Sequence, residues 1–267
     1  MTIQEFLPGL GMGELTSQMA DSWTSIVETP VYIIVGVTGV GKSTTIEALQ
    51  ALGVEVTLLP NRRALTDHLI ISYLQQQDGD PIKPVKDRIQ RFDYTRRYRE
   101  RFAGGMAHAL AQLKLKIGKQ HGMIFFDGLR GENEVTCALE ELPNAQFIVL
   151  AAPDVVRTQR LLGRADSFDQ VSASERTTQS HSLDIEGIED LFSQQEIDQL
   201  LALVDGETVT IDDLRAKLQI VMTERRNYDP TATASVLMTR VPERTLIVDT
   251  TMNTPEEAAQ QIQAFMK

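Results

Sequence analysis

The segment GVTGVGKS, residues 36–43, places a lysine and a serine behind three spaced glycines. Such a backbone can curl so that successive N–H groups face a phosphate, and a following helix directs its positive end to the same point. Lys42 would then reach the β- and γ-phosphates, and the Ser43 hydroxyl would bind Mg²⁺. A chance glycine-rich turn is disfavoured because strand, loop and helix follow in the required order. The segment therefore predicts an ATP site formed by Gly36, Val37, Thr38, Gly39, Val40, Gly41, Lys42, Ser43 and Thr44.

A second chemically useful pair, Asp127 and Arg130, ends the apolar run of MIFFDGLRG. In doubly wound sheets, ligands bind at the carboxyl ends of the strands, so Asp127 would face the Mg²⁺ near Ser43. It could hold a metal-bound water or take a proton from an attacking hydroxyl. Arg130 could hold an anionic acceptor through two parallel hydrogen bonds. The competing interpretation is a capped strand end with a surface arginine.

Both motifs need strands that end at one edge of a sheet, and five apolar runs supply candidate strands. They occupy residues 30–36, 54–60, 122–128, 145–152 and 244–251. Helical patterns lie between them, including residues 61–77 and residues 85–119 with a break at 104–105, and further helices are expected at 14–27 and 254–267. Strands that alternate with helices predict an α/β fold, with a mainly parallel sheet covered by helices on both faces.

The charge of the chain is unevenly distributed. Residues 165–215 contain 13 acidic and 2 basic residues, so their net charge of −11 equals that of the whole chain. This imbalance predicts an acidic helical insertion at 165–222, within a core of residues 30–164 and 223–267 that follows an N-terminal extension of residues 1–29. Capping patterns predict helices at 194–204 and 211–225. Their amphipathic character makes the insertion a candidate contact for a second copy of the chain or for a protein partner.

The composition also argues against several classes of protein. An acidic chain is a poor general nucleic-acid binder, and no apolar run approaches the roughly 18 residues of a membrane span. The start of the chain has no basic and apolar pattern of a secretory signal. The single cysteine, Cys137, allows no internal disulfide and fits a reducing compartment. We therefore expect a cytoplasmic protein in which Cys137 is a small apolar packing residue.

The stretch FFDGLRG resembles the Asp-Gly-x-x-Arg stretch of adenylate kinases. With the following Glu134-Val135, it is closer still to the Asp-Gly-(Val/Leu)-Arg stretch of adenylate-kinase-related and dephospho-CoA-kinase-like proteins. The resemblance covers residues 31–164 and 223–267. It implies a P-loop kinase-like three-layer fold, with a five-stranded parallel sheet of order 2-3-1-4-5 and a helical lid. It also implies that arginines after the second and third strands hold a phosphate of the acceptor, namely Arg62, Arg63 and Arg130.

The segment APDVVRTQRLLGR resembles the family's helix with two arginines four residues apart. The resemblance implies that Arg160 lies over the adenine and that Arg164 begins the lid and reaches the transferring phosphate. Where the chain returns from the lid, Arg225 and Arg226 match arginines that close on the phosphates. The alternative for both is a solvated last turn of a helix, where cations are favourable anyway. The implied catalytic set is Lys42, Asp127, Arg164, Arg225 and Arg226.

The DGLR stretch lacks the proline of true adenylate kinases, so the sequence leaves the acceptor open. The first hypothesis is transfer of the γ-phosphate of ATP to a phosphorylated, nucleotide-like small molecule. A variant uses Asp127 as the base that activates a hydroxyl of a nucleoside, sugar or antibiotic. A regulatory ATPase is the third hypothesis. It is weakened because machine-like ATPases place a glutamate after the strand-end aspartate, where this chain has Gly128.

Overall fold

The computed structural model describes residues 3–119, 122–163, 185–205 and 209–267. Its centre is a five-stranded parallel sheet with strand order β5-β7-β4-β8-β9. The strands are β4 (Val31–Val35), β5 (Val56–Leu58), β7 (Met123–Leu129), β8 (Ala145–Ala151) and β9 (Thr245–Asp249). Numbered along the chain, this is the order 2-3-1-4-5, so the predicted α/β class and strand order are confirmed.

Helices cover both faces of this sheet because its strands are apolar on both sides. In β4, Ile33 and Val35 face one core, and Tyr32 and Ile34 face the other. The first face is covered by α5 (Met106–Ala111), α6 (Glu132–Glu141) and α10 (Pro230–Arg240), and the second by α1 (Lys42–Ala51) and α11 (Pro255–Phe265). These are the three predicted layers. The start of α11 is also as predicted, with a capping box between Thr254 and Glu257.

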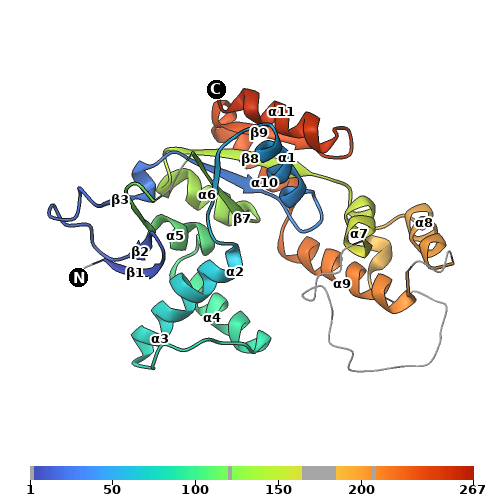
Figure 1. Cartoon of the computed structure of the whole chain (residues 1–267). Coiled ribbons are helices and arrows are strands. Elements are labelled where there is room, and N and C mark those ends of the chain that lie inside the picture. The colour runs from blue at the N-terminus through green and yellow to red at the C-terminus, as the bar shows by residue number, and fades with distance from the viewer. Residues whose placement is uncertain (1–2, 120–121, 164–184, 206–208) are drawn as a thin grey trace.

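Between β5 and β7 the chain forms a helical group beside the sheet (Figure 1). It contains α2 (Arg62–Leu65), the π-helical turn η2 (Thr66–Ile71), α3 (Ser72–Asp78) and α4 (Arg88–Arg101), followed by α5. The helix expected at 61–77 is therefore present. The helical stretch expected at 85–119 ends early, because residues 114–116 form strand β6 (Lys114–Lys116).

The helix expected at 14–27 is wrong. The N-terminal segment instead forms β1 (Gln4–Leu7), β2 (Leu10–Met12), β3 (Trp23–Ser25) and the 3₁₀ turn η1 (Ile26–Glu28). Strand β1 pairs with β2, and β2 and β3 both pair with β6, which gives an antiparallel sheet of order β1-β2-β6-β3. Trp23 and Leu115 are buried by this pairing, which outweighs the weak helical pattern.

Over its described residues, 185–205 and 209–222, the acidic segment is helical, as predicted. It contains η4 (Ile188–Asp190), α8 (Gln194–Asp205) and α9 (Ile211–Asn227), which pack against α7 (Asp154–Leu162). Their apolar residues form a separate core, which includes Leu161, Leu200 and Leu218. Helix α9 crosses the predicted boundary at residue 223 without a break, so the division into core and insertion stays a prediction. So does docking of a partner through this segment.

A short 3₁₀ turn, η5 (Pro242–Arg244), leads from α10 into β9. Within the ranges given above, no helix has both the length and the apolar character needed to cross a membrane.

Candidate active site

The GVTGVGKS segment, residues 36–43, connects β4 to the start of α1 at the carboxyl edge of the sheet. We call it the phosphate loop after its predicted role. Two of its glycines are required by close contacts. A Cβ on Gly36 would lie 2.9 Å from the carbonyl oxygen of Leu150, and one on Gly39 would lie 3.0 Å from the carbonyl oxygen of Arg157. Gly39 also has a φ of +86°, which disfavours other residues. The loop is therefore held closely between the neighbouring strand β8 and helix α7.

Lys42 lies at the mouth of this loop. Its Nζ donates to the carbonyl oxygens of Gly36 and Val37, at 3.0 and 2.9 Å, and lies 3.7 Å from Asp127 Oδ1. The side chain is only 11% exposed, and this burial lowers the pKa of Lys42 while the Asp127 carboxylate opposes the shift. The ammonium group is thus placed where a phosphate bound in the loop would meet it.

Asp127 reaches the loop because β7 is the direct neighbour of β4 in the sheet, with Ile34 opposite Asp127. Asp127 lies beside Lys42, the residue before Ser43, and carboxylate and hydroxyl oxygens suit Mg²⁺, which takes its remaining ligands from water and substrate phosphates. Among the described residues, no group of three or more metal-ligating side chains offers a complete cage for a metal ion. Asp127 and Ser43 therefore fit a magnesium ion that arrives with a nucleotide.

Glu224, at the end of α9, is at the centre of the site, although the sequence did not single it out. Its Oε2 accepts from the backbone N–H of Thr38, at 3.0 Å, and its Oε1 accepts from the Thr38 hydroxyl, at 2.6 Å. It also pairs with Arg130 at 2.7 Å and with Arg157 at 2.5 Å. One buried carboxylate thus joins the phosphate loop, the end of β7 and helix α7.

Arg157, on α7, is the second residue that sequence reasoning missed, and it is completely buried. Its Nε donates to the carbonyl oxygen of Thr38 at 2.8 Å, and its two terminal nitrogens pair with Asp154 and Glu224, both at 2.5 Å. Each of the three guanidinium nitrogens therefore has an acceptor, and the side chain fixes the loop against α7. The only sequence signal was its spacing of three residues from Asp154, on the helix that also carries Arg160.

Arg225 belongs to this cluster, and Arg226 does not. The Arg225 Nε lies 3.2 Å from Asp154 Oδ2, but without the geometry of a hydrogen bond. Arg226 points the other way, toward the carbonyl oxygen of Glu186 at 3.4 Å. The structure therefore brings the first of these two expected catalytic arginines near the loop and places the other against the acidic segment. Arg164 lies outside the described residues.

The expected acceptor arginines are divided. Arg62 forms a two-pronged pair with Glu134, at 2.5 and 2.7 Å, and donates to the carbonyl oxygen of Gly128 at 2.6 Å. Burial alone would lower the pKa of Arg62, but the Glu134 carboxylate raises it above its usual range. Arg63 is exposed, and Arg130 points to Glu224. Arg130 is thus connected to the loop through Glu224, whereas Arg62 is held by Glu134.

Arg160 lies behind the loop, beside a cavity of about 270 Å³. Its guanidinium donates to the hydroxyl and the carbonyl oxygen of Thr250, both at 2.8 Å, and more weakly to Gly39. Thr44 and Pro255 are among the other lining residues. Arg160 and the turn before α11 therefore flank one cavity next to the phosphate loop.

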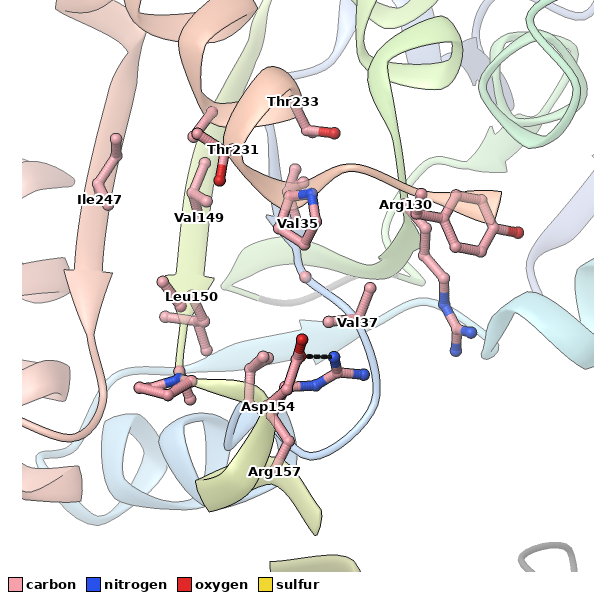
Figure 2. A pocket seen from close by; sticks show the side chains of 18 of the residues that line it. Val35, Val37, Arg130, Val149, Leu150, Asp154, Arg157, Thr231, Thr233 and Ile247 are labelled. Atoms are coloured by element: carbon pink, nitrogen blue, oxygen red, sulfur yellow. Dashed lines mark hydrogen bonds and ion pairs between the residues drawn. The ribbon is translucent and has the colours of Figure 1, made fainter. Parts of the chain in front are cut away.

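A larger cavity of about 470 Å³ lies on the other side of the loop, between the carboxyl ends of β4, β8 and β9 and the start of α10. Its floor is apolar and includes Val35, Val149 and Ile247. Figure 2 shows Arg157 and Asp154 joined at one end, while Thr231 and Thr233 of α10 line the far side. This cavity can hold a small molecule that has both an apolar part and polar groups.

No protein-family model and no curated protein sequence matches the chain. Solved structures that match the chain include a sugar kinase from Janibacter sp. HTCC2649, with 13% identity, 89% of this chain and 94% of that chain covered, and a TM-score of 0.34. A gluconokinase from Sinorhizobium meliloti 1021 has 16% identity, coverages of 89% and 91%, and a TM-score of 0.37. A shikimate kinase from Acinetobacter baumannii, in complex with shikimate, has 15% identity, coverages of 90% and 94%, and a TM-score of 0.37. Because these TM-scores are low, the function is inferred from the residues of this chain alone.

Proposed function

We propose that this protein is a phosphotransferase that moves the γ-phosphate of ATP to a small-molecule acceptor. The observation that carries the proposal is the cluster around residues 36–43. It combines a glycine-rich loop, a buried lysine at its mouth, a carboxylate from the neighbouring strand, and arginines from the end of that strand and from α7. Phosphoryl transfer depends mainly on positioning and on neutralising phosphate charge, and this cluster contains the groups for both.

The donor side of the proposal uses the loop and the smaller cavity behind it. The loop N–H groups and Lys42 would bind the phosphates, and the adenine would lie in the cavity flanked by Arg160 and Thr250. A guanidinium next to a cavity of this size suits stacking on a planar base. Mg²⁺, held by Asp127 and Ser43, would supply charge neutralisation at the phosphates.

On the acceptor side, Asp127 is placed to accept a proton from an attacking hydroxyl, because its carboxylate lies beside Lys42 at the loop. Arg130 is the best candidate to hold an anionic group of the acceptor, since its guanidinium already binds the Glu224 carboxylate. Together these residues support an acceptor with a phosphate or carboxylate, as in the nucleotide-like class expected from the sequence.

A second candidate is a kinase that acts on a hydroxyl of an uncharged nucleoside, sugar or antibiotic. The engagement of Arg62 favours it, because Glu134 and the Gly128 carbonyl occupy this guanidinium and leave fewer arginines for an acceptor phosphate. A regulatory ATPase without an acceptor is the remaining alternative from the sequence.

The test is a panel of nucleoside monophosphates, nucleosides, sugars and small hydroxy acids, each supplied with ATP and Mg²⁺ and scored by release of ADP. The proposal predicts that at least one compound raises the rate above the basal hydrolysis of ATP. Stimulation by phosphorylated or carboxylated compounds alone supports the first candidate, and stimulation by uncharged alcohols supports the second. A rate that no compound changes favours the regulatory ATPase.

A further inference from the structure

The four hydrogen-bond donors around Glu224 form an oxyanion site. They are the backbone N–H and the hydroxyl of Thr38, and one guanidinium each from Arg130 and Arg157. Their distances to the carboxylate oxygens are between 2.5 and 3.0 Å, the range of charge-assisted hydrogen bonds. Thr38 is 186 residues from Glu224 along the chain, so local chain geometry does not account for the contact.

Phosphate and carboxylate present similar acceptor oxygens, and forked arginines bind either of them. The donors that Glu224 uses include one from the phosphate loop itself, where backbone N–H groups are expected to bind phosphate. Two further donors are arginines, the residues best suited to a phosphate. The Glu224 carboxylate therefore stands where the chemistry of the site calls for a phosphate oxygen.

We propose that Glu224 is an internal substitute for a phosphate group: its carboxylate fills the oxyanion site of Thr38, Arg130 and Arg157, and a bound phosphoryl group displaces it. The inference deepens the proposed function and rests on it for the presence of a phosphorylated ligand at the loop. Two sources share this chemistry, the γ-phosphate of ATP and a phosphate of the acceptor.

The position of Glu224 allows it to leave the site. It lies in the last turn of α9, where the negative end of the helix disfavours an anion. A phosphate that takes over Arg130 and Arg157 would release this turn, so that α9 could shift relative to the loop. The same helix carries Arg225, which pairs with Asp154. Displacement of Glu224 by a phosphate would thus be connected to a movement of α9, and with it of Arg225.

The test compares the native chain with Glu224→Gln, which keeps the shape of the side chain and removes its charge. Asp212→Asn is the matched control, because it removes one charge from the same helix at a position that is 86% exposed. The affinity for a non-hydrolysable ATP analogue with Mg²⁺, and separately for AMP, is measured by calorimetry. Unfolding temperatures are recorded with and without each ligand.

We expect Glu224→Gln to raise the affinity for at least one ligand by about tenfold, since a neutral amide competes less strongly for the arginines than a carboxylate. Its unfolding temperature without ligand should fall, while Asp212→Asn should change neither quantity. A gain for the ATP analogue alone assigns the site to the donor, and a gain for AMP alone assigns it to the acceptor. A lower unfolding temperature with no gain in affinity for either ligand would overturn the inference, because it indicates a purely structural ion pair.

If Glu224→Gln does not fold, the affinity of Glu224→Asp for the same ligands is measured instead. Its shorter side chain keeps the charge and cannot span all four donors. It should show a smaller gain in affinity, and an unchanged or lower affinity overturns the inference. Failure of the proposed function is distinguishable, because it shows as the absence of any acceptor that raises ADP release in the panel, whereas this inference is tested by ligand affinity without turnover.

Discussion

Replacing Arg157 by methionine should strongly destabilise the fold, because this guanidinium is completely buried and serves three partners. Removing one member of a buried ion pair costs about 3–5 kcal/mol, since a charge is left without compensation. Here the two carboxylates that lose Arg157 keep other partners: Glu224 retains Arg130 and Thr38, and Asp154 retains Arg225. We therefore expect the lower end, about 3 kcal/mol, against a typical total stability of roughly 5–15 kcal/mol.

The assay is urea unfolding followed by circular dichroism. With an m-value of roughly 2–3 kcal/mol/M, a loss of about 3 kcal/mol lowers the midpoint by about 1–1.5 M. The control is Arg96→Met, because Arg96 also pairs with two acids, Asp93 and Glu100, but on the exposed face of α4. Its midpoint should hardly move, since solvent screens exposed pairs. Equal midpoints for the two variants would refute the argument that burial gives the Arg157 pairs their strength.

Three further predictions follow from the site and its surroundings. Arg160→Met should lower the affinity for ATP about tenfold and leave the affinity for inorganic tripolyphosphate unchanged in calorimetry, because Arg160 flanks the base cavity; equal losses for both ligands would place it at the phosphates instead. Cys137 should resist alkylation by iodoacetamide at pH 8 in the folded chain and react after unfolding, as seen by mass spectrometry, because burial raises the pKa of its thiol to about 12. The affinity for ATP should fall as pH rises from the lowered pKa of Lys42 toward its ordinary value of 10.5, with proton uptake on binding, since phosphate favours the charged amine; calorimetry in buffers of different ionisation enthalpy measures this uptake.

The sequence predicted the features that depend on local patterns. Apolar runs identified all five strands of the parallel sheet, and the spacing of Gly36, Gly39 and Gly41 identified the phosphate loop. Capping residues located the starts of α8 and α9, because a cap is a contact between residues three apart. The approach of Asp127 to Lys42 was also predictable, once the order of the strands was inferred.

The features that the sequence did not show depend on contacts between distant residues. In the sequence, Glu224 is an acidic residue followed by two arginines, and this pattern predicts no contact with the loop. The packing of α9 against α7 and the loop brings it to Thr38. Arg157 is not one of the two arginines that the resemblance implies, Arg160 and Arg164, and its contacts with Thr38 and Glu224 join residues far apart in the sequence. The helix predicted at 14–27 is wrong because β3, which lies within it, pairs with β6 some 90 residues further along the chain, and pairing of that kind leaves little trace in a local pattern.

The central claim, transfer of phosphate through the loop at residues 36–43, is tested most directly by the fate of the γ-phosphate. The chain is incubated with Mg²⁺, ATP labelled in its γ-phosphate and the mixed acceptor panel, and the labelled products are separated. We predict that the label appears on an organic acceptor with the native chain, and that Lys42→Ala, which removes the side chain carrying the amine at the loop, folds and forms no labelled acceptor. Label that the native chain releases only as inorganic phosphate, or a folded Lys42→Ala variant that transfers it at the native rate, would contradict the account.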